Sequence, residues 1–300
     1  MFRKALATMA IMAVTCSFAQ GQETAQPEEK KEKFGWIKSL VGSINLTQTH
    51  FSSNWTQGGE NALAWKGVIG TRWENNQPKT NWRNTAKLAY GQIKQGDEGV
   101  RKSDDEIRAE SVFTYKIGKY LNPYASFNGE TQMTKGYKYT VVEGVTVQEP
   151  VSDFFSPAFL RESAGVGYKP GENFITRLGF SVKQTIVTKE SISFNGQEYF
   201  LRPLYGNKLD EAVRVETGIE STTDFTQKLE ENVLFLSKLQ LFTSFENFNT
   251  VDITWDNTLT AKISKLFAIN VFARVFYDED VLPEVQLKED LGFGITYTFF

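Results

Sequence analysis

One short segment holds the residue types that nucleophilic catalysis needs. His50, Ser52 and Asn54 occupy alternate positions, so an extended chain places all three on one face. A serine hydroxyl becomes a nucleophile when a histidine takes its proton and a third polar group orients the imidazole ring. His50 is the single histidine in the sequence, so no second base of this kind is present. We therefore predict that the protein is not an enzyme, with ester hydrolysis at this segment as an alternative.

Candidate metal ligands are also few. The one cysteine is Cys16, whereas a conventional zinc site needs several cysteine or histidine side chains. Carboxylates could bind calcium instead, although solvated loop charge is the commoner explanation for such acidic clusters. The three clusters are Asp97 and Glu98; Ser103, Asp104 and Asp105; Asp278, Glu279 and Asp280. The sequence predicts no metal site and no cofactor.

A glycine-rich loop motif follows the His50 segment. It consists of Asn54, Trp55, Gly58, Gly59, Glu60 and Asn61. The glycines permit positive φ angles and close backbone approach, the asparagines can cap turns, and the tryptophan can anchor the loop against a wall or an interface. The motif can serve as a rigid first hairpin that helps the fold to close, or as a ligand or partner site at the mouth of the molecule.

The composition limits the elements that could position these residues. The 300 residues include 33 basic and 36 acidic side chains, are 40% hydrophobic and 14% aromatic, and have a mean hydropathy of −0.35. This apolar content excludes general disorder, and its fine dilution with polar residues excludes a bundle of apolar membrane helices. Because there is no basic excess to hold phosphates, we also exclude nucleic-acid binding.

The N-terminal segment predicts export. Residues 1–19 combine Arg3 and Lys4, an apolar run, and small residues before a cleavage position after Ala19, which is the pattern of a signal peptide. Residues 20–41 begin with a charged stretch, and we expect them to form a flexible periplasmic lead-in. The mature chain would then contain no cysteine, so its stability must come from burial and backbone pairing rather than disulfides.

The rest of the chain alternates with a period of two. Leu63, Trp65, Ile69 and Trp73, for example, share one face of a stretch whose other face is polar and charged, as expected for a β-strand. No helical period of comparable length interrupts this pattern. We predict twelve strands, near residues 43–51, 62–74, 81–94, 105–117, 121–133, 159–169, 173–188, 211–222, 230–245, 250–264, 266–278 and 286–299.

Such strands fit either a soluble sandwich or barrel with a dry core, or a membrane barrel with a polar lumen. The connections distinguish the two. Every predicted connection of ten residues or more follows an odd-numbered strand, whereas those after even-numbered strands are short: 75–80, 118–120, 170–172, 223–229 and 264–265. Outer-membrane barrels have this asymmetry. We therefore predict an all-β fold, a closed antiparallel transmembrane β-barrel over residues 42–300, with short periplasmic turns and longer outer loops.

Two further features agree with a membrane barrel. Aromatic residues such as Trp73 and Trp82 gather at strand ends, where lipid interfaces would lie. An even number of strands lets the sheet close, which is required because unpaired amides are costly in hydrocarbon. The segment from Gly294 to Phe300 resembles the C-terminal signal of outer-membrane barrels, with Phe300 one residue beyond the usual final aromatic position. We expect outer-membrane lipid and the barrel-assembly machinery as partners, in a diderm bacterium.

Two segments resemble a known family. Asn45 to Gln48 (NLTQ) and Ser53 to Asn61 (SNWTQGGEN), followed by the alternating stretch from Leu63, are similar to the hallmark of an uncharacterised outer-membrane barrel family of the Bacteroidetes, domain of unknown function 3078. The resemblance implies an outer-membrane location and no established activity.

The segment from His50 to Asn54 is also similar to the H-x-S-N-G segment of outer-membrane phospholipases, which are twelve-stranded barrels. In that family the segment lies on a strand in mid-barrel, and the orienting asparagine lies on the neighbouring strand. Here the asparagine is displaced by one position, Trp55 replaces the glycine, and the segment lies in the first strand. A calcium-dependent phospholipase-like activity is therefore the least favoured alternative.

Charged residues occupy the face that would line the lumen. The alternation places 9 acidic and 14 basic side chains there, and buried charges are tolerated only when they are paired or hydrated. The basic excess favours a narrow pore or transporter for small polar or anionic solutes, and the alternative is a barrel plugged by ion pairs with a structural or partner-docking role. The candidate lumen residues are Lys66, Arg72, Arg83, Lys87, Arg108, Glu110, Arg177, Arg214, Glu216, Asp252, Asp256 and Arg274.

Overall fold

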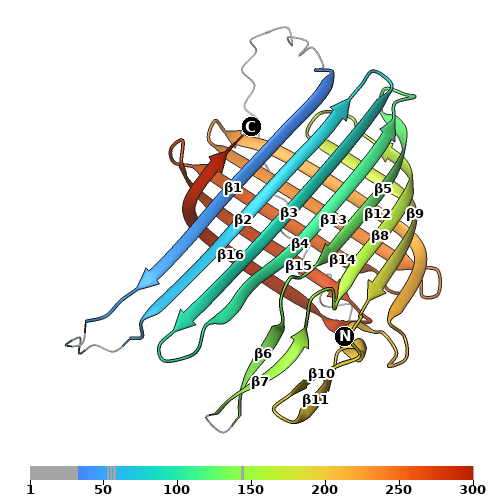
Figure 1. The fold of residues 1–300 in the computed structure, drawn as a ribbon. Helices are drawn as coiled ribbons and strands as arrows, with labels where there is room; N and C mark the ends of the chain where they lie inside the picture. The colour runs from blue at the N-terminus through green and yellow to red at the C-terminus, as the bar shows by residue number, and fades with distance from the viewer. Residues whose placement is uncertain (1–32, 53, 55, 57–58, 143–144, 300) are drawn as a thin grey trace. The chain divides into compact units, whose positions relative to one another are not determined.

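A closed β-barrel dominates the computed structural model, which describes residues 33–52, 54, 56, 59–142 and 145–299 (Figure 1). Its strands are β1 (Gly35–Thr49), β2 (Ala62–Asn76), β3 (Thr80–Gln95), β4 (Arg101–Tyr115), β5 (Leu121–Thr131), β8 (Ala158–Tyr168), β9 (Phe174–Ile186), β12 (Val213–Glu230), β13 (Val233–Ser244), β14 (Asp252–Lys262), β15 (Phe267–Asp278) and β16 (Leu282–Thr298). They follow one another around the ring in the order β1-β16-β15-β14-β13-β12-β9-β8-β5-β4-β3-β2. The predicted twelve-stranded antiparallel barrel is confirmed.

Three details differ from the predicted strands. β1 begins at Gly35, so residues 35–41 belong to the barrel and not to the predicted lead-in. β12 continues to Glu230, and the predicted connection 223–229 therefore lies inside a strand. Its residues Thr222 to Thr226 are mostly polar, so the sequence shows no alternation of apolar and polar residues there. The predicted signal peptide, most of the lead-in and Phe300 lie outside the described residues.

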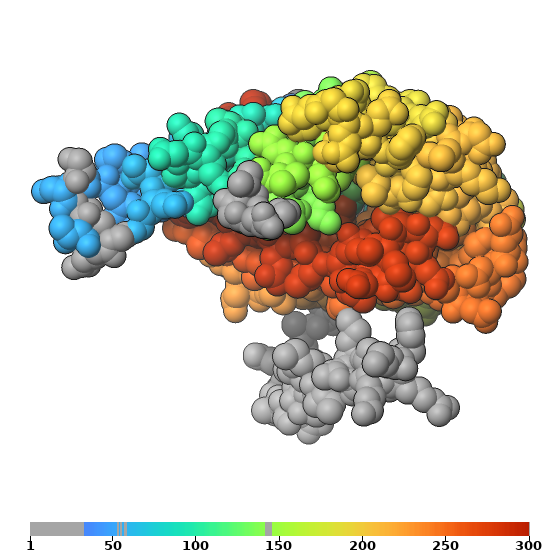
Figure 2. All heavy atoms as spheres, turned by 90° about the horizontal axis from the view of Figure 1, so that it is seen from below, coloured from blue at the N-terminus to red at the C-terminus, as the bar shows by residue number. Residues whose placement is uncertain are grey.

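The connections at the two ends of the barrel differ in length. At one end, called here the short-turn end, they comprise residues 77–79, 116–120, 169–173, 231–232 and 263–266. At the opposite, long-loop end, two connections contain structure of their own: the hairpin β6 (Gly136–Val142) with β7 (Val145–Ser152), and the hairpin β10 (Ser191–Phe194) with β11 (Gln197–Phe200), which precedes the 3-10 helix η1 (Arg202–Tyr205). Tyr137 and Phe194 join the hairpins through ring centroids 5.5 Å apart, and Figure 2, which looks at this end, shows the green and yellow segments beside each other.

The outward face of the barrel is apolar. Ile44, Leu46, Leu178 and Leu291 are 65%, 59%, 60% and 75% exposed, whereas the alternate positions on the same strands point into the ring. Leaving such a face in water costs about 25 cal/mol for each Å², so this surface requires apolar surroundings. Among the described residues, no helix is both long enough and apolar enough to cross a membrane.

Polar atoms on the outward face are satisfied between neighbouring strands. The indole N–H of Trp82 on β3 donates to the hydroxyl of Ser111 on β4 at 2.9 Å, and Trp255 on β14 donates to Ser237 on β13 at the same distance. An unpaired indole N–H would be costly in hydrocarbon. The wide apolar rings can therefore face lipid without leaving a donor unsatisfied.

Candidate functional site

Charged side chains fill the interior of the barrel. Their positions follow from strand geometry, because residues two apart on a strand point to the same side. On β4, Asp104, Glu106, Arg108 and Glu110 all point inward, and each forms an ion pair. The interior is thus assembled from ionic contacts between strands rather than from an apolar core.

Four charged residues form a square across the middle of the lumen. Arg108 on β4 pairs with Glu130 on β5 at 2.5 Å, and Arg274 on β15 pairs with Asp256 on β14 at 2.6 Å. Two further contacts join these pairs, from Arg108 to Asp256 at 2.7 Å and from Arg274 to Glu130 at 2.8 Å. Since β4 and β14, and likewise β5 and β15, are six steps apart in the twelve-strand ring, both of these contacts join opposite walls. We call these four residues the central square.

A second cluster lies toward the short-turn end. Glu110 accepts from Lys238 at 2.5 Å and lies 3.4 Å from Arg177. Asp224 lies 2.5 Å from the same arginine and 3.5 Å from Arg83 on β3. Arg177 is only 2% exposed. Because these residues come from β3, β4, β9, β12 and β13, this cluster too connects distant parts of the ring.

A third cluster lies toward the long-loop end, around Lys183 on β9. Its ammonium group lies 2.6 Å from Asp252, 2.7 Å from Asp278 and 3.4 Å from Glu216, and the residue is 1% exposed. Arg214 shares Glu216 at 3.1 Å. One buried cation therefore holds together carboxylates from β12, β14 and β15.

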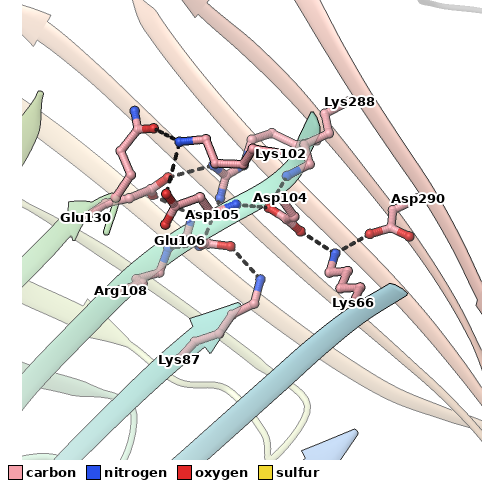
Figure 3. Close-up of polar contacts among 12 residues, drawn as sticks. Lys66, Lys87, Lys102, Asp104, Asp105, Glu106, Arg108, Glu130, Lys288 and Asp290 are labelled. Atoms are coloured by element: carbon pink, nitrogen blue, oxygen red, sulfur yellow. Dashed lines mark hydrogen bonds and ion pairs between the residues drawn. The ribbon is translucent and has the colours of Figure 1, made fainter. Parts of the chain in front are cut away.

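A fourth cluster connects β2, β4 and β16, and Figure 3 shows its four side chains. Lys66 on β2 lies 2.5 Å from Asp104 on β4 and also pairs with Asp290 on β16. Lys288, two residues before Asp290, reaches Asp104 at 2.8 Å. These four residues, here called the seam cluster, connect β16 to β2 and β4 without involving a side chain of β1.

Two cavities lie in the interior on either side of the central square. One, of about 480 Å³, faces the short-turn end and is lined by six basic and four acidic side chains. The other, of about 360 Å³, faces the long-loop end and is lined by four basic and two acidic side chains. Arg108 and Asp256 line the first cavity, and Glu130 and Arg274 line the second. The central square therefore forms the boundary between two polar cavities.

Ionic and buried polar contacts also organise the long loops. Burial would raise the pKa of Asp153, but the Lys189 ammonium and the Phe154 N–H stabilise its charged form and hold the pKa below its usual value. Burial raises the pKa of Tyr205 to about 12, and its hydroxyl donates to the Val151 carbonyl at 2.8 Å. These contacts fasten the segments around β7 and η1 to each other.

Part of the sequence matches a known protein family. Residues 46–137 match the family model "Protein of unknown function (DUF3078)". The predicted resemblance to that family is confirmed. The matched segment includes the loop motif and the β4 residues of the central square and seam cluster.

Solved structures give similar barrels at low sequence identity. The translocator domain of the autotransporter NalP from Neisseria meningitidis is 9% identical, with 89% of this chain and 90% of that chain covered and a TM-score of 0.43. An outer membrane channel from Pseudomonas putida F1 is 8% identical, with 92% and 99% covered and a TM-score of 0.40. No curated protein matches the sequence.

The structure places all twelve candidate lumen residues in ion pairs. Eleven of them belong to the clusters above or, in the case of Lys87, join one through Glu106 at 2.7 Å. Arg72 stands apart, because its side chain is 51% exposed and pairs with Glu74 two residues along its own strand.

Sequence reasoning missed three inward carboxylates, Asp104, Asp224 and Asp278. Asp224 fell in a stretch taken as a connection, and the other two were assigned to loops. Adding these three to the nine predicted acids gives twelve, so the predicted excess of five bases over acids shrinks to two.

The loop motif is tied to its own hairpin and to the next loop. The side-chain oxygen of Asn61 accepts from the Phe51 N–H at 2.7 Å, and its carbonyl accepts from the Gly96 N–H at 2.7 Å. Gly59 adopts φ 116° with the Phe51 ring against it, and the Glu60 side chain lies against Gly96. Trp55 and Gly58 lie outside the described residues. These contacts favour the role of a rigid first hairpin.

The candidate catalytic serine bonds within its own segment, and several candidate calcium-binding carboxylates are paired with bases. Ser52 donates its hydroxyl to the side-chain oxygen of Asn54 at 2.6 Å. In the calcium clusters, Asp104 and Asp278 are bound by lysines, as described above, and Asp280 lies 2.5 Å from Arg214. Within the part of the chain that the structure describes, no group of three or more histidine, cysteine or acidic side chains could hold a metal ion.

Proposed function

We propose that the protein is an outer-membrane barrel that provides a narrow pore for small polar solutes, with a weak preference for anions. The observation that carries the proposal is the pair of polar cavities, each lined by two more bases than acids, that meet at the central square. Only one layer of side chains separates them. A solute that passed this layer would find hydrated, mildly basic surroundings on both sides.

The apolar outward face supports the location in an outer membrane, because it is the reverse of a soluble barrel. We propose that the short-turn end faces the periplasm and that β16 carries the signal for the barrel-assembly machinery. Residues 1–19 would act as a signal peptide. In this proposal the protein performs no catalytic step, and its work is done by the geometry and charge of the lumen.

The central square could act as a gate because it is formed by side chains and not by backbone. The side chains of Arg108 and Arg274 are each 16% exposed, so both remain partly accessible from the lumen. Each arginine borders a cavity, so its side chain has polar space to move into. Rotation of two long side chains could therefore open a path without separating any barrel strands.

A specific observation also favours the second candidate, a plugged barrel that acts as a structural or docking protein. The two long contacts of the central square join opposite walls directly. Such contacts can brace the barrel as well as gate it. The two functions differ in whether the square ever opens.

Planar bilayers distinguish the two candidates. We expect purified protein to give small, stable conductance steps, with a reversal potential in a potassium chloride gradient that is biased toward chloride. A preference for potassium would contradict the anion selectivity. Complete silence, with correctly folded protein present in the bilayer, would reject the pore and support the plugged barrel.

A further inference from the structure

The barrel closes through a short contact between its first and last strands. β1 and β16 pair over five residues, from Val41 with Thr298 to Asn45 with Gly294. The next shortest contact, between β4 and β5, has eight pairs. If the same register continued, Leu46 would face Phe293, but in the described part of the chain the pairing stops at Asn45. Figure 1 shows the two strands running in different directions from this contact.

Both strands continue beyond this contact, each paired on its other side. β1 remains paired with β2 as far as Thr49, and β16 remains paired with β15 from Ile295 back to Leu282. Their facing edges are therefore open toward the long-loop end. Open strand edges are costly in hydrocarbon and are tolerated at membrane depth only where they line a hydrated cavity. Here the polar interior supplies that hydration.

The two faces of this open seam differ in polarity. Outward, Ile44 and Leu46 on β1 and Leu291 and Phe293 on β16 are each more than half exposed. Inward lies the seam cluster, two lysines and two aspartates that bond one another across the gap. At this place, apolar side chains and a charged interior meet with no complete sheet between them.

Unsatisfied polar atoms occur along these two strands. The Asn45 Oδ1 and Thr296 Oγ1 atoms, and the amide nitrogen of the Gln286 side chain, are buried and have no hydrogen-bond partner among the described residues. Buried polar atoms normally have a partner. A polar group entering the seam would find the Asn45 acceptor where the pairing stops, and the Gln286 donor farther along β16 toward the long-loop end.

We propose that the seam between β1 and β16 is a lateral portal that binds an amphiphile. The polar head group would lie inside, near Lys66, Lys288 and Asp290, and the tail would leave between Leu46 and Phe293 into the bilayer. Because the seam cluster contains equal numbers of positive and negative groups, it fits a zwitterionic or polar head better than a strongly charged one. The inference rests on the proposed membrane location and not on conductance.

Photolabelling tests the portal. The protein is placed in phosphatidylcholine vesicles with lysophosphatidylcholine that carries a diazirine in its head group, and labelled residues are mapped by mass spectrometry. A second arm uses a fatty acid with the diazirine beside its carboxylate. We expect label on the inward residues Asn45, Thr47 and Lys288, and stronger label with the zwitterionic probe. Outward Leu178 on β9 should be unlabelled by these head-group probes, as should inward Ser181 on the same strand.

Paired cysteines provide a matched control. Oxidation of a Leu46→Cys and Phe293→Cys variant closes the seam by a disulfide in the continued register, whereas oxidation of an Ile44→Cys and Ile295→Cys variant joins residues that already pair. Both variants replace two outward apolar side chains. The first disulfide should abolish label at Thr47 and Lys288, the second should leave it, and reduction of the first should restore it.

Three results would overturn the portal. The first is an absence of label on inward seam residues of the unlocked protein. The second is label that the disulfide between positions 46 and 293 does not change. The third is a second copy of the chain covalently joined through a single cysteine at either position, which would make the seam a strand-pairing surface. Conductance of the same samples is a separate readout. Silence with seam labelling would reject the pore alone, and conductance without seam labelling would reject the portal alone.

Discussion

The central square and the seam hold the barrel together in opposite ways. In the square, ion pairs join walls six strands apart, whereas at the seam two adjacent strands share only five backbone pairs. Strands that lie far apart in the ring are joined by several ion pairs, whereas the two strands that close the ring share few backbone pairs. The number of strands therefore does not determine which parts of such a barrel are rigid. Charged side chains can hold opposite walls together even where neighbouring strands separate.

The largest effect on stability is expected at the buried lumen charges. Lys183→Ala would leave Asp252, Asp278 and Glu216 facing one another without their shared cation. We expect a loss of about 3 kcal/mol in the free energy of unfolding, because removing one partner of a buried ionic cluster leaves uncompensated charge. Urea unfolding in lipid vesicles measures it.

Lys94→Ala is the matched control, since Lys94 is an exposed lysine near the end of β3. It should change the free energy of unfolding by less than about 0.5 kcal/mol. Equal losses for the two variants would show that the lumen charges do not brace the barrel.

A smaller effect is expected at the seam. A side chain at Gly294 would overlap the carbonyl oxygen of Ile44 and the backbone of Asn45. Gly294→Ala should therefore separate the last backbone pair and cost about 1–2 kcal/mol, a typical penalty for overpacking. Hydrogen exchange of the β1 amides should accelerate at the same time.

Gly70→Ala provides the comparison, because a side chain at Gly70 on β2 meets nothing within 4 Å. It should leave both the stability and the β1 exchange rates unchanged. If Gly294→Ala had no greater effect than Gly70→Ala, the five-pair contact would not be the barrel's closure.

The smallest effect is expected in the long loops, which neither the square nor the seam supports. Because the folded-state pKa of Asp153 lies below its usual value, its pairing with Lys189 stabilises the folded loop above the unfolded pKa of about 4. That contribution is lost as pH falls through the folded value. Lys189 is half exposed, so the loss should stay below about 1 kcal/mol.

Exchange of the Ser156 amide, corrected for the intrinsic effect of pH, measures this change, because that N–H donates to the Asp153 carbonyl. Protection should fall between pH 5 and pH 3, within the range set by the carboxyl group. Asp153→Asn should show the lower protection already at pH 7. Protection that is independent of pH in both proteins would refute the assignment.

Sequence alone predicted the twelve strands because period-two alternation assigns each residue to a face. It also placed residues such as Arg108 and Asp256 inside the barrel. It could not predict that they form an ion pair, because contacts across the ring depend on how the barrel closes and on the register of its strands. The inward position of Asp224 was not predicted because the residues around it are polar on both faces of the strand. The short β1–β16 contact was missed because both strands alternate well beyond the point where they separate.

The central claim is that ion pairs of the central square close the lumen, and single-channel conductance of Arg274→Ala against Arg72→Ala tests it most directly. Both variants remove one inward arginine, but Arg274 alone joins opposite walls, while Arg72 pairs along its own strand. We predict that Arg274→Ala raises the conductance severalfold and that Arg72→Ala leaves it at the wild-type value. Equal conductance in the wild type and Arg274→Ala would contradict the claim.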